Sequence, residues 1–379
     1  MKHLTRWACA LLALCLILTL TACGGASQPE GPPDLPGLTY ESTMPLQYAD
    51  QFAVYRYAGG YSLIDMVSSD RILVVPQGKE APEGLPGDIV TVPQGLDHIY
   101  LAATSAMALF EAIGGMDAIS FVGSKHWYTP AAIAALDSGK FTYAGKYNAP
   151  DYELLLHSGC QLAIESTMIL HNPEVKEKMT ELGIKTVVER SSYENHPLGR
   201  TEWMKVYGVL LGREAEAEAA FAAQAEKISA LTGLDATGKT AAFFYISTSG
   251  SVVTYKTNGY VPAMIGIAGG EYVLRDPGLD DDSKLSTVNV SMEQFYADAC
   301  AADVVIYNCS IASQLYTLND FLSLSPVLED FAAVQSGQVW TTTESMFQQT
   351  DKMGDIIEEM HRIFSGTADD TMTYFFRLQ

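Results

Sequence analysis

The feature that most constrains the fold is an alternation of short apolar strands with helices, interrupted once by a long stretch of helical periodicity. Apolar residues between about 200 and 231 recur at helical spacing and predict one continuous helix roughly 45 Å long. Alternating strands and helices are typical of parallel α/β sheets. We therefore expect an α/β protein with two parallel-sheet lobes joined by a single long interlobe helix. Strands are predicted at 119–122, 162–164 and 186–188 before that helix, and at 241–246, 303–307 and 339–341 after it.

The first residues predict export and lipid attachment. Lys2 and Arg6 precede a short apolar run that ends in Leu20-Thr21-Ala22-Cys23. A positive flank, a short apolar core and small residues are typical of an export signal. The terminal Cys resembles a bacterial lipobox, which implies cleavage before Cys23 and a diacylglycerol group on its thiol. The alternative is an ordinary signal with an incidental Cys.

The chain divides into five segments. Residues 24–37 are rich in Gly, Pro and polar residues, which predicts a flexible tether. Residues 52–66 and 70–76 carry apolar runs and turn residues typical of a small β-hairpin or ribbon. The expected segments are the signal peptide (1–22), the lipidated Cys with its tether (23–50), an N-terminal lobe (51–199), the interlobe helix (200–232) and a C-terminal lobe (233–379).

Charge and cysteine content exclude some classes of partner. The chain carries a formal charge of −22, and removing residues 1–22 takes away two cations and no acid, which leaves −24. Such a surface repels nucleic acid, so we expect no nucleic-acid partner. Cys160, Cys300 and Cys309 have no metal-site spacing, and a disulfide between the last two stays open. The seven His show no HxH or HExxH pattern, so no metal site is predicted.

One nucleotide-binding pattern is rejected by its context. Residues 233–240 read GLDATGKT and match the phosphate-loop pattern. That loop binds phosphate only when a strand precedes it and a helix follows. Here the order of helix and strand is reversed. We interpret the segment as a turn.

Several segments together resemble a known family. The predicted helix at 104–114 precedes ISFVGS (119–124), and YELL (152–155) precedes QLAIE (161–165). They are followed by YGVLLGRE (207–214), MIGIAGG (264–270) and SMEQF (291–295) before ADVVI (302–306). Their order and spacing over about residues 85–365 resemble the periplasmic-binding-protein family that serves iron-siderophore, haem and vitamin B12 importers. The stretch at 191–203 is unusual for that family.

The resemblance implies a substrate-binding lipoprotein of an ABC importer. Such a protein holds a small-molecule ligand in the cleft between its lobes and delivers it to a membrane permease and its ATPase. It is a monomer without catalytic residues or a resident cofactor, lies outside the cytoplasm on the membrane by its lipid, and binds a ligand that itself carries iron or cobalt. Siderophore, haem and corrinoid all remain open. The alternatives are a metal-ion receptor of a related family and a secreted α/β enzyme, which the lack of GxSxG and HExxH disfavours.

The resemblance also implies two docking residues. In the family, one Glu on each lobe pairs with Arg on the permease, and the matching positions are Glu153 and Glu293. Each lies in the first turn of a short predicted helix. The alternative role of both carboxylates is to stabilise the dipole of their own helix.

Ligand-binding candidates follow the carboxyl ends of the predicted strands, where open parallel sheets bind ligands. Lys125, Arg190, His196 and Arg200 are cationic donors suited to carboxylate or catecholate groups. Aromatic side chains beside them could stack on a flat ligand. Alternatively, Arg200 pairs with a nearby Glu and braces the helix. The expected ligand-binding residues are Lys125, His126, Trp127, Tyr128, Glu165, Arg190, His196, Arg200, Ser247, Thr248, Tyr255 and Asn308.

Overall fold

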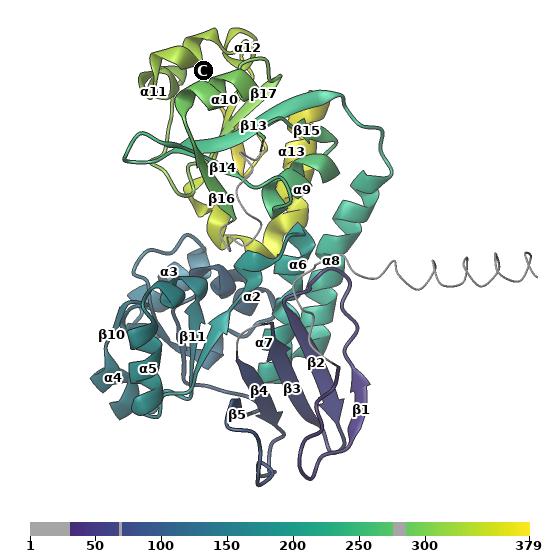
Figure 1. The fold of residues 1–379 in the computed structure, drawn as a ribbon, viewed down its shortest axis with the longest axis vertical. Helices are drawn as coiled ribbons and strands as arrows, with labels where there is room; N and C mark the ends of the chain where they lie inside the picture. Colours follow the sequence, from purple (N-terminus) through teal and green to yellow (C-terminus); the bar gives the residue numbers. More distant parts are fainter. Residues whose placement is uncertain (1–30, 68–69, 276–285) are drawn as a thin grey trace, which may run out of the picture.

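The computed structural model describes residues 31–67, 70–275 and 286–379. The predicted signal peptide and Cys23 lie outside the described residues. Figure 1 shows two α/β lobes, one stacked on the other, with α8 running along one side of both. Within the described ranges, no helix combines the length and the apolar character needed to cross a membrane.

The first lobe is built on a five-stranded parallel sheet in the order β12-β11-β6-β7-β8. The predicted strands at 119–122, 162–164 and 186–188 are confirmed. One face packs Tyr100 and Ala163 under the helices α4 and α5, and the other packs Leu101 and Ile164 toward α2. The elements are β6 (Ile99–Leu101), β7 (Ile119–Val122), β8 (Thr142–Tyr143), β11 (Leu162–Ser166), β12 (Thr186–Glu189), α2 (Met107–Ala112), α3 (Pro130–Asp137), α4 (Tyr152–His157) and α5 (Pro173–Glu181), with the small pair β9 (Gly145–Lys146) and β10 (Ala149–Pro150).

A second sheet of five strands precedes the parallel one, where the sequence predicted a small hairpin or ribbon. Strands β1 to β4 pair antiparallel, and β5 joins β4 in parallel. Val54 and Ile72 point into the main core, whereas Tyr55 and Leu73 point to the opposite face under Leu35. The strands are β1 (Tyr40–Thr43), β2 (Phe52–Tyr57), β3 (Tyr61–Met66), β4 (Arg71–Val75) and β5 (Ile89–Pro93).

The N-terminal segment is held more closely than a tether would be. Residues 40–43, assigned to the tether from sequence, form the edge strand β1. The backbone amides of residues 47–49 donate to the buried carboxylate of Glu202, and those of Asp50 and Gln51 donate to Glu194. The region from residue 40 onward is therefore part of the first lobe.

The prediction of one continuous interlobe helix is wrong. The stretch forms three helices, α6 (Pro197–Glu202), α7 (Met204–Leu211) and α8 (Glu214–Thr232). Gly212 adopts a left-handed conformation with φ of 69° and ends α7, which is the usual role of Gly at a helix C-terminus. The chain then turns back, and α7 packs against α8. Only α8, about 28 Å long, runs from one lobe to the other.

The second lobe is built on a mixed sheet with a parallel centre. The predicted strands at 241–246, 303–307 and 339–341 are confirmed as β13 (Lys239–Ile246), β17 (Val304–Tyr307) and β18 (Val339–Thr342), which are parallel. The strands β14 (Val252–Tyr255), β16 (Thr287–Val290) and β19 (Phe375–Arg377) add antiparallel edges, and β15 (Gly270–Tyr272) pairs with β13. The helices are α9 (Tyr260–Ile267), α10 (Met292–Ala299), α11 (Leu318–Ser323), α12 (Ala332–Gln335) and α13 (Met353–Ser365).

One apolar core runs through the junction of the lobes. Trp203 of the first lobe and Phe243 of the second belong to the same buried cluster, together with Phe221 and Ile228 of α8 and Met360 of α13. Bending the lobes apart would expose part of this shared core to water, which is unfavourable. The junction therefore favours small movements.

Candidate ligand-binding site

The edge of the first-lobe sheet faces the second lobe. Because β6, β7, β11 and β12 are parallel, the loops after them leave on the same side. The connection between β18 and α13 of the second lobe, residues 343–352, lies against this side. Its Gln348 hydrogen-bonds the loop after β7, and the carbonyl of Thr350 accepts a 2.9 Å hydrogen bond from Thr201 of α6.

The four predicted residues after β7 share one cavity. Lys125, His126, Trp127 and Tyr128 line a space of about 410 Å³, together with part of α3 and with Glu344 from the second lobe. The cavity therefore lies between the lobes, with an aromatic wall and charges of both signs.

The loop after β7, residues 123–129, is held from both lobes. Trp127 is buried, and its Nε1 donates to the carbonyl of Ser124 at 3.1 Å. The half-exposed Tyr128 meets Phe347 of the second lobe edge-on, with ring centres 6.0 Å apart. The ammonium group of Lys125 lies 4.5 Å from the centre of a tyrosine ring on β8.

Arg190 and Arg200, the arginine pair, lie in the interior near the lobe junction. Their exposed fractions are 5% and 9%. The guanidinium of Arg190 lies 4.5 Å from the ring centre of Tyr193, and that of Arg200 lies 4.2 Å from the ring centre of Tyr260, which belongs to α9 of the second lobe. Among the described residues, neither Nε has a hydrogen-bond partner. Leaving a buried donor unpaired costs about 1–3 kcal/mol, so both groups retain capacity for an anion.

Glu189 is a counter-charge near both arginines, and Asp70 also acts on Arg190. The carboxylate of Glu189 accepts a 2.9 Å hydrogen bond from the amide of Ser191. Burial raises the pKa of Glu189, although the Ser191 hydrogen bonds and the charges of the arginine pair act in the opposite direction. When Glu189 is protonated, the cluster is positive and favours an anionic group.

The alternative role of Arg200 was to pair with Glu202 or Glu194 and brace the start of the helix, but both glutamates have other partners. Glu202 pairs with Lys205 at 3.0 Å and accepts the N-terminal amides, while Glu194 accepts from Nε1 of Trp203 at 2.8 Å. Arg200 is left facing Tyr260.

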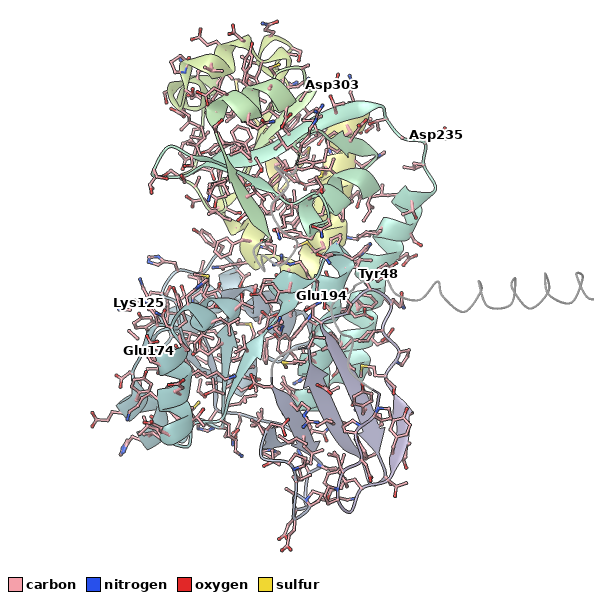
Figure 2. All side chains as sticks on the ribbon, in the orientation of Figure 1. Tyr48, Lys125, Glu174, Glu194, Asp235 and Asp303 are labelled. Carbon is pink, nitrogen blue, oxygen red and sulfur yellow. The ribbon has the colours of Figure 1, made fainter. Side chains whose placement is uncertain are left out.

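His196 begins α6. Its ring stacks on Tyr48 with centres 4.4 Å apart, and its Nδ1 accepts from the amide of Leu198 at 3.2 Å. Burial lowers the pKa of His196. In Figure 2, Tyr48 and Glu194 lie together near α6 and Lys125 lies apart from them at the opposite edge of the same first lobe, so the predicted residues form two separate groups.

Glu165 faces the interior of the first lobe. The side chain is fully buried, and neither carboxylate oxygen has a partner within the described part of the chain. Burial raises its pKa to about 8. Burial also raises the pKa values of Tyr100 and of Tyr152 on α4, and the charge of Glu165 acts on both tyrosines in the same direction. The predicted cleft residue therefore lies on the α4 side of the sheet.

The predicted residues of the second lobe also fall into two groups. Asn308 donates to the hydroxyl of Tyr255 at 2.8 Å, and Tyr255 meets Tyr260 edge-on at 6.0 Å. Both therefore lie behind the tyrosine that faces Arg200. Ser247 and Thr248 lie in the turn between β13 and β14, where Ser247 contacts Ser249.

Sequence reasoning missed Tyr260, Glu344 and Gln348. Glu344 and Gln348 follow the carboxyl end of β18, so the same rule that selected the other loops could have found them. Tyr260 opens a helix that follows an antiparallel strand, and no pattern in the sequence marks it.

The predicted docking residues are both exposed in the first turns of their helices, Glu153 in α4 and Glu293 in α10. Hydrogen bonds from its own backbone amide and from Ser291 lower the pKa of Glu293.

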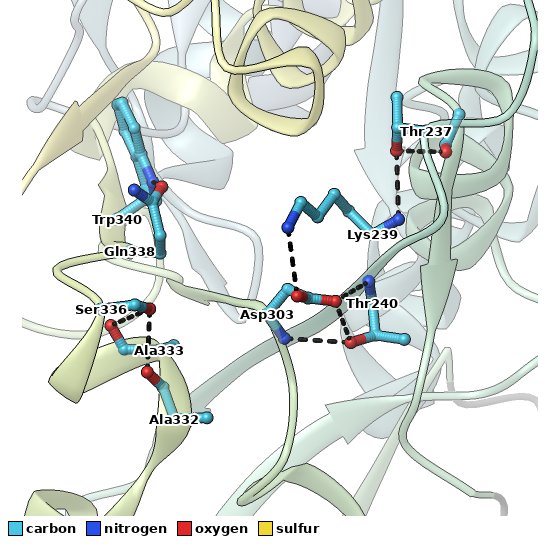
Figure 3. Close-up of polar contacts among 10 residues, drawn as sticks. Thr237, Lys239, Thr240, Asp303, Ala332, Ala333, Ser336, Gln338 and Trp340 are labelled. Atoms are coloured by element: carbon cyan, nitrogen blue, oxygen red, sulfur yellow. Dashed lines mark hydrogen bonds and ion pairs between the residues drawn. The ribbon is translucent and has the colours of Figure 1, made fainter.

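The phosphate-loop pattern is a turn, as predicted, with α8 before it and β13 after it. Its Lys239 pairs with Asp303 at 3.2 Å, and Thr240 donates hydrogen bonds to the same carboxylate (Figure 3).

No group of three or more His, Cys, Asp or Glu suited to a metal ion occurs in the described ranges, where Cys160, Cys300 and Cys309 are free thiols.

The sequence profile of the periplasmic binding protein family matches residues 101–346. The match spans most of the chain, from β6 to the segment after β18 that contacts the first lobe. The chain belongs to the periplasmic binding protein family. The sheet of β1 to β5 precedes the matched residues.

Two relatives are lipoproteins. The chain is 27% identical to an uncharacterized lipoprotein of Methanocaldococcus jannaschii over 69% of this chain and 62% of the relative. It is 23% identical to a second one from the same organism, over 88% of this chain and 87% of the relative. The chain thus spans less than two thirds of the first relative's length.

Solved structures share the fold. A periplasmic binding protein from Veillonella parvula matches with a TM-score of 0.58 and 18% identity, over 73% of this chain and 93% of the other. A periplasmic haem-binding protein from Pseudomonas aeruginosa matches with a TM-score of 0.55 and 17% identity, over 72% and 94%. A protein of an ABC-type Fe³⁺-hydroxamate transport system from Saccharomonospora viridis gives 0.54 and 16%, over 72% and 94%. At these identities the likeness establishes the two-lobed α/β fold of this family of binding proteins.

Proposed function

We propose that this periplasmic binding protein is the ligand-capturing lipoprotein of an ABC importer. It takes up an organic metal chelate, a ferric siderophore, haem or corrinoid, and delivers it to a membrane permease coupled to an ATPase. It acts as a monomer, and the metal arrives within the ligand. Neither a catalytic step nor a resident cofactor is part of the proposal.

The observation that supports an anionic ligand is the arginine pair. Two buried guanidinium groups with unpaired Nε donors lie beside the lobe junction in a protein whose overall charge is −22. Carboxylate and catecholate oxygens match the planar donor groups of Arg. The aromatic wall formed by Trp127 and Tyr128 suits a flat or ring-bearing body.

A panel of ligands tests the proposal. The mature protein is mixed with ferric haem, a ferric hydroxamate, a ferric catecholate and cyanocobalamin, and its unfolding temperature and absorption spectrum are recorded. A ligand bound to the native state at 100 times its Kd stabilises the fold by about 2.7 kcal/mol, so at least one chelate should raise the unfolding temperature. If free Fe³⁺ or Zn²⁺ stabilises the protein and all four chelates fail, the metal-ion receptor replaces this proposal.

We also propose that Cys23 anchors the protein, on the basis of Leu20-Thr21-Ala22-Cys23. A lipid chain contributes about 0.8 kcal/mol per buried CH₂, so an acylated protein should partition into membranes. Cys23→Ser should move the protein to the soluble fraction of cells, as measured by fractionation and immunoblotting. Cys160→Ser is the control and should stay with the membranes. Equal membrane retention of Cys23→Ser would contradict the anchor.

A further inference from the structure

The loop after β7 is held by an amide side chain that crosses the lobe junction. The Oε1 of Gln348 accepts from the backbone amide of Tyr128 at 3.1 Å, and its Nε2 donates to the carbonyl of His126 at 3.1 Å. The side chain is 2% exposed. Gln348 belongs to the second lobe, whereas the two groups that it binds belong to the first.

In these two contacts the amide side chain of Gln348 acts once as a donor and once as an acceptor. An amide side chain offers both a donor and an acceptor, and here it bridges the carbonyl of one residue and the N–H of the second residue after it. Ser124 holds the base of the same loop, with its Oγ 3.0 Å from the amide of His126. The same Oγ also lies 3.1 Å from the carbonyl of His126, to which it donates, so the amide of Tyr128 is the group of this loop whose partner comes from the second lobe.

Neighbouring contacts link the same segment to the first lobe. Phe347 meets Tyr128 edge-on, and the carbonyl of Thr350 accepts from Thr201 of α6. Glu344, at the start of the segment, lines the cavity that Lys125, His126, Trp127 and Tyr128 also line. The second lobe is thus in direct contact with the wall of this cavity.

We infer that Gln348 is a positioning residue that sets the loop at residues 126–128 according to the distance between the lobes. With both hydrogen bonds made, the loop keeps the position in which Trp127 and Tyr128 form the aromatic wall. Even the small lobe movement that the shared core allows lengthens these bonds past hydrogen-bonding distance, and the mouth of the cavity loosens. Ligand entry and exit are then coupled to lobe movement by one side chain.

Hydrogen–deuterium exchange of the ligand-free mature protein tests the positioning role. The variants are Gln348→Ala, Gln348→Asn, which keeps the amide on a chain one methylene shorter, and Gln349→Ala as the matched control at a half-exposed neighbour. Peptides that contain Tyr128 should exchange about three- to tenfold faster in both Gln348 variants, because the hydrogen bond from the Tyr128 amide, which is of ordinary strength, is lost. In the control the exchange rate should be unchanged. Circular dichroism melting checks that each variant folds. Equal exchange in Gln348→Asn and wild type would overturn the inference.

A kinetic arm rests on the proposed function and uses ferric haem as the probe. In Gln348→Ala, both association and dissociation should accelerate several-fold while Kd changes less than threefold, because the residue positions the wall without contacting the ligand. Dissociation at the wild-type rate in a variant with faster amide exchange would refute the coupling to ligand exchange. If the wild-type protein does not bind ferric haem, haem is ruled out as the ligand. The hydrogen–deuterium exchange measurement still decides whether Gln348 is a positioning residue.

Discussion

The buried charged side chains of this protein differ in whether other residues of the chain provide their hydrogen-bond and ion-pair partners. Glu202 accepts the amides of three residues and pairs with Lys205, so its charge is fully compensated. Glu165 and the arginine pair, by contrast, keep unpaired atoms among the described residues. An uncompensated buried group lowers stability and persists where it has another use.

Glu165 gives a prediction for the pH dependence of stability. Burial raises its pKa to about 8 in the folded protein, well above the value of about 4.3 in an unfolded chain. The folded state therefore holds the extra proton between these pH values, and the stability of the protein falls as the pH rises through this window. The slope is at most about 1.4 kcal/mol per pH unit. Glu165→Gln should remove the part of this slope that comes from Glu165 and raise the free energy of unfolding at pH 8, while Glu194, whose pKa burial also raises to about 8, keeps its own contribution.

Urea denaturation at intervals from pH 5 to pH 8.5 measures this effect. Glu153→Gln, at an exposed position in the same lobe, is the control and should keep the wild-type pH dependence. Parallel stability curves for wild type and Glu165→Gln would contradict the assigned pKa.

The structure places some of the predicted site residues at the lobe border and others on a different face of the sheet. The strand-end rule placed residues 125–128 at the lobe border, because the loop after a parallel strand has only one side on which to leave. It failed for Glu165, since β11 is buried on both faces and lacks the alternation that would tell which face a side chain occupies.

At the scale of elements, the α7–α8 hairpin is the main difference between prediction and structure. Apolar residues recur at helical spacing on both sides of Gly212, and a pattern of period 3.6 cannot distinguish one helix from two packed helices. The left-handed Gly212 was the available signal, but Gly also occurs inside helices. The short helices predicted around Glu153 and Glu293 are present as α4 and α10, whose first turns are capped by the side chains of Asp151 and Ser291.

The unusual stretch at 191–203 has a structural role that sequence alone did not reveal. Glu194 and Glu202 attach residues 47–51 to α6, the helix that carries Arg200. Glu202→Gln should lower the free energy of unfolding by about 2–4 kcal/mol, because it breaks a buried ion pair and weakens the hydrogen bonds to the N-terminal amides.

Glu218→Gln is the matched control for that change. Glu218 pairs with the same Lys205 at 2.9 Å, but its side chain is 59% exposed, so the loss should be below about 1 kcal/mol. Chemical denaturation of both variants measures the difference. Equal losses would show that burial of Glu202 adds nothing.

At the scale of the whole molecule, the two lobes and their parallel centres were predictable because strand–helix alternation leaves few arrangements. The five-stranded N-terminal sheet was not, since its pairing depends on contacts distant in sequence. The link through α8 and the shared core favour a rigid body that presents both lobes to a partner at once.

We propose that both lobes dock on the permease through Glu153 and Glu293, and this can be tested. Glu153 and Glu293 are exposed and begin helices in the two lobes. Changing both to Ala should reduce uptake of the bound chelate by at least tenfold in cells and leave the affinity of the isolated protein unchanged. Glu174→Ala, at an exposed first-turn position in α5, is the control. Wild-type uptake by the double variant would remove the docking role.

The central claim is that the arginine pair binds the anionic group of the ligand. Titration calorimetry with the chelate that the panel identifies tests it in three proteins: wild type, Arg200→Gln and, as control, Arg275→Gln at an exposed surface position. A charged hydrogen bond contributes about 1.5–3 kcal/mol, so Arg200→Gln should weaken binding tenfold or more, with little change in the free energy of unfolding. Arg275→Gln should bind as wild type does. Unchanged affinity in Arg200→Gln, or a loss of stability that precedes any loss of binding, would contradict the claim.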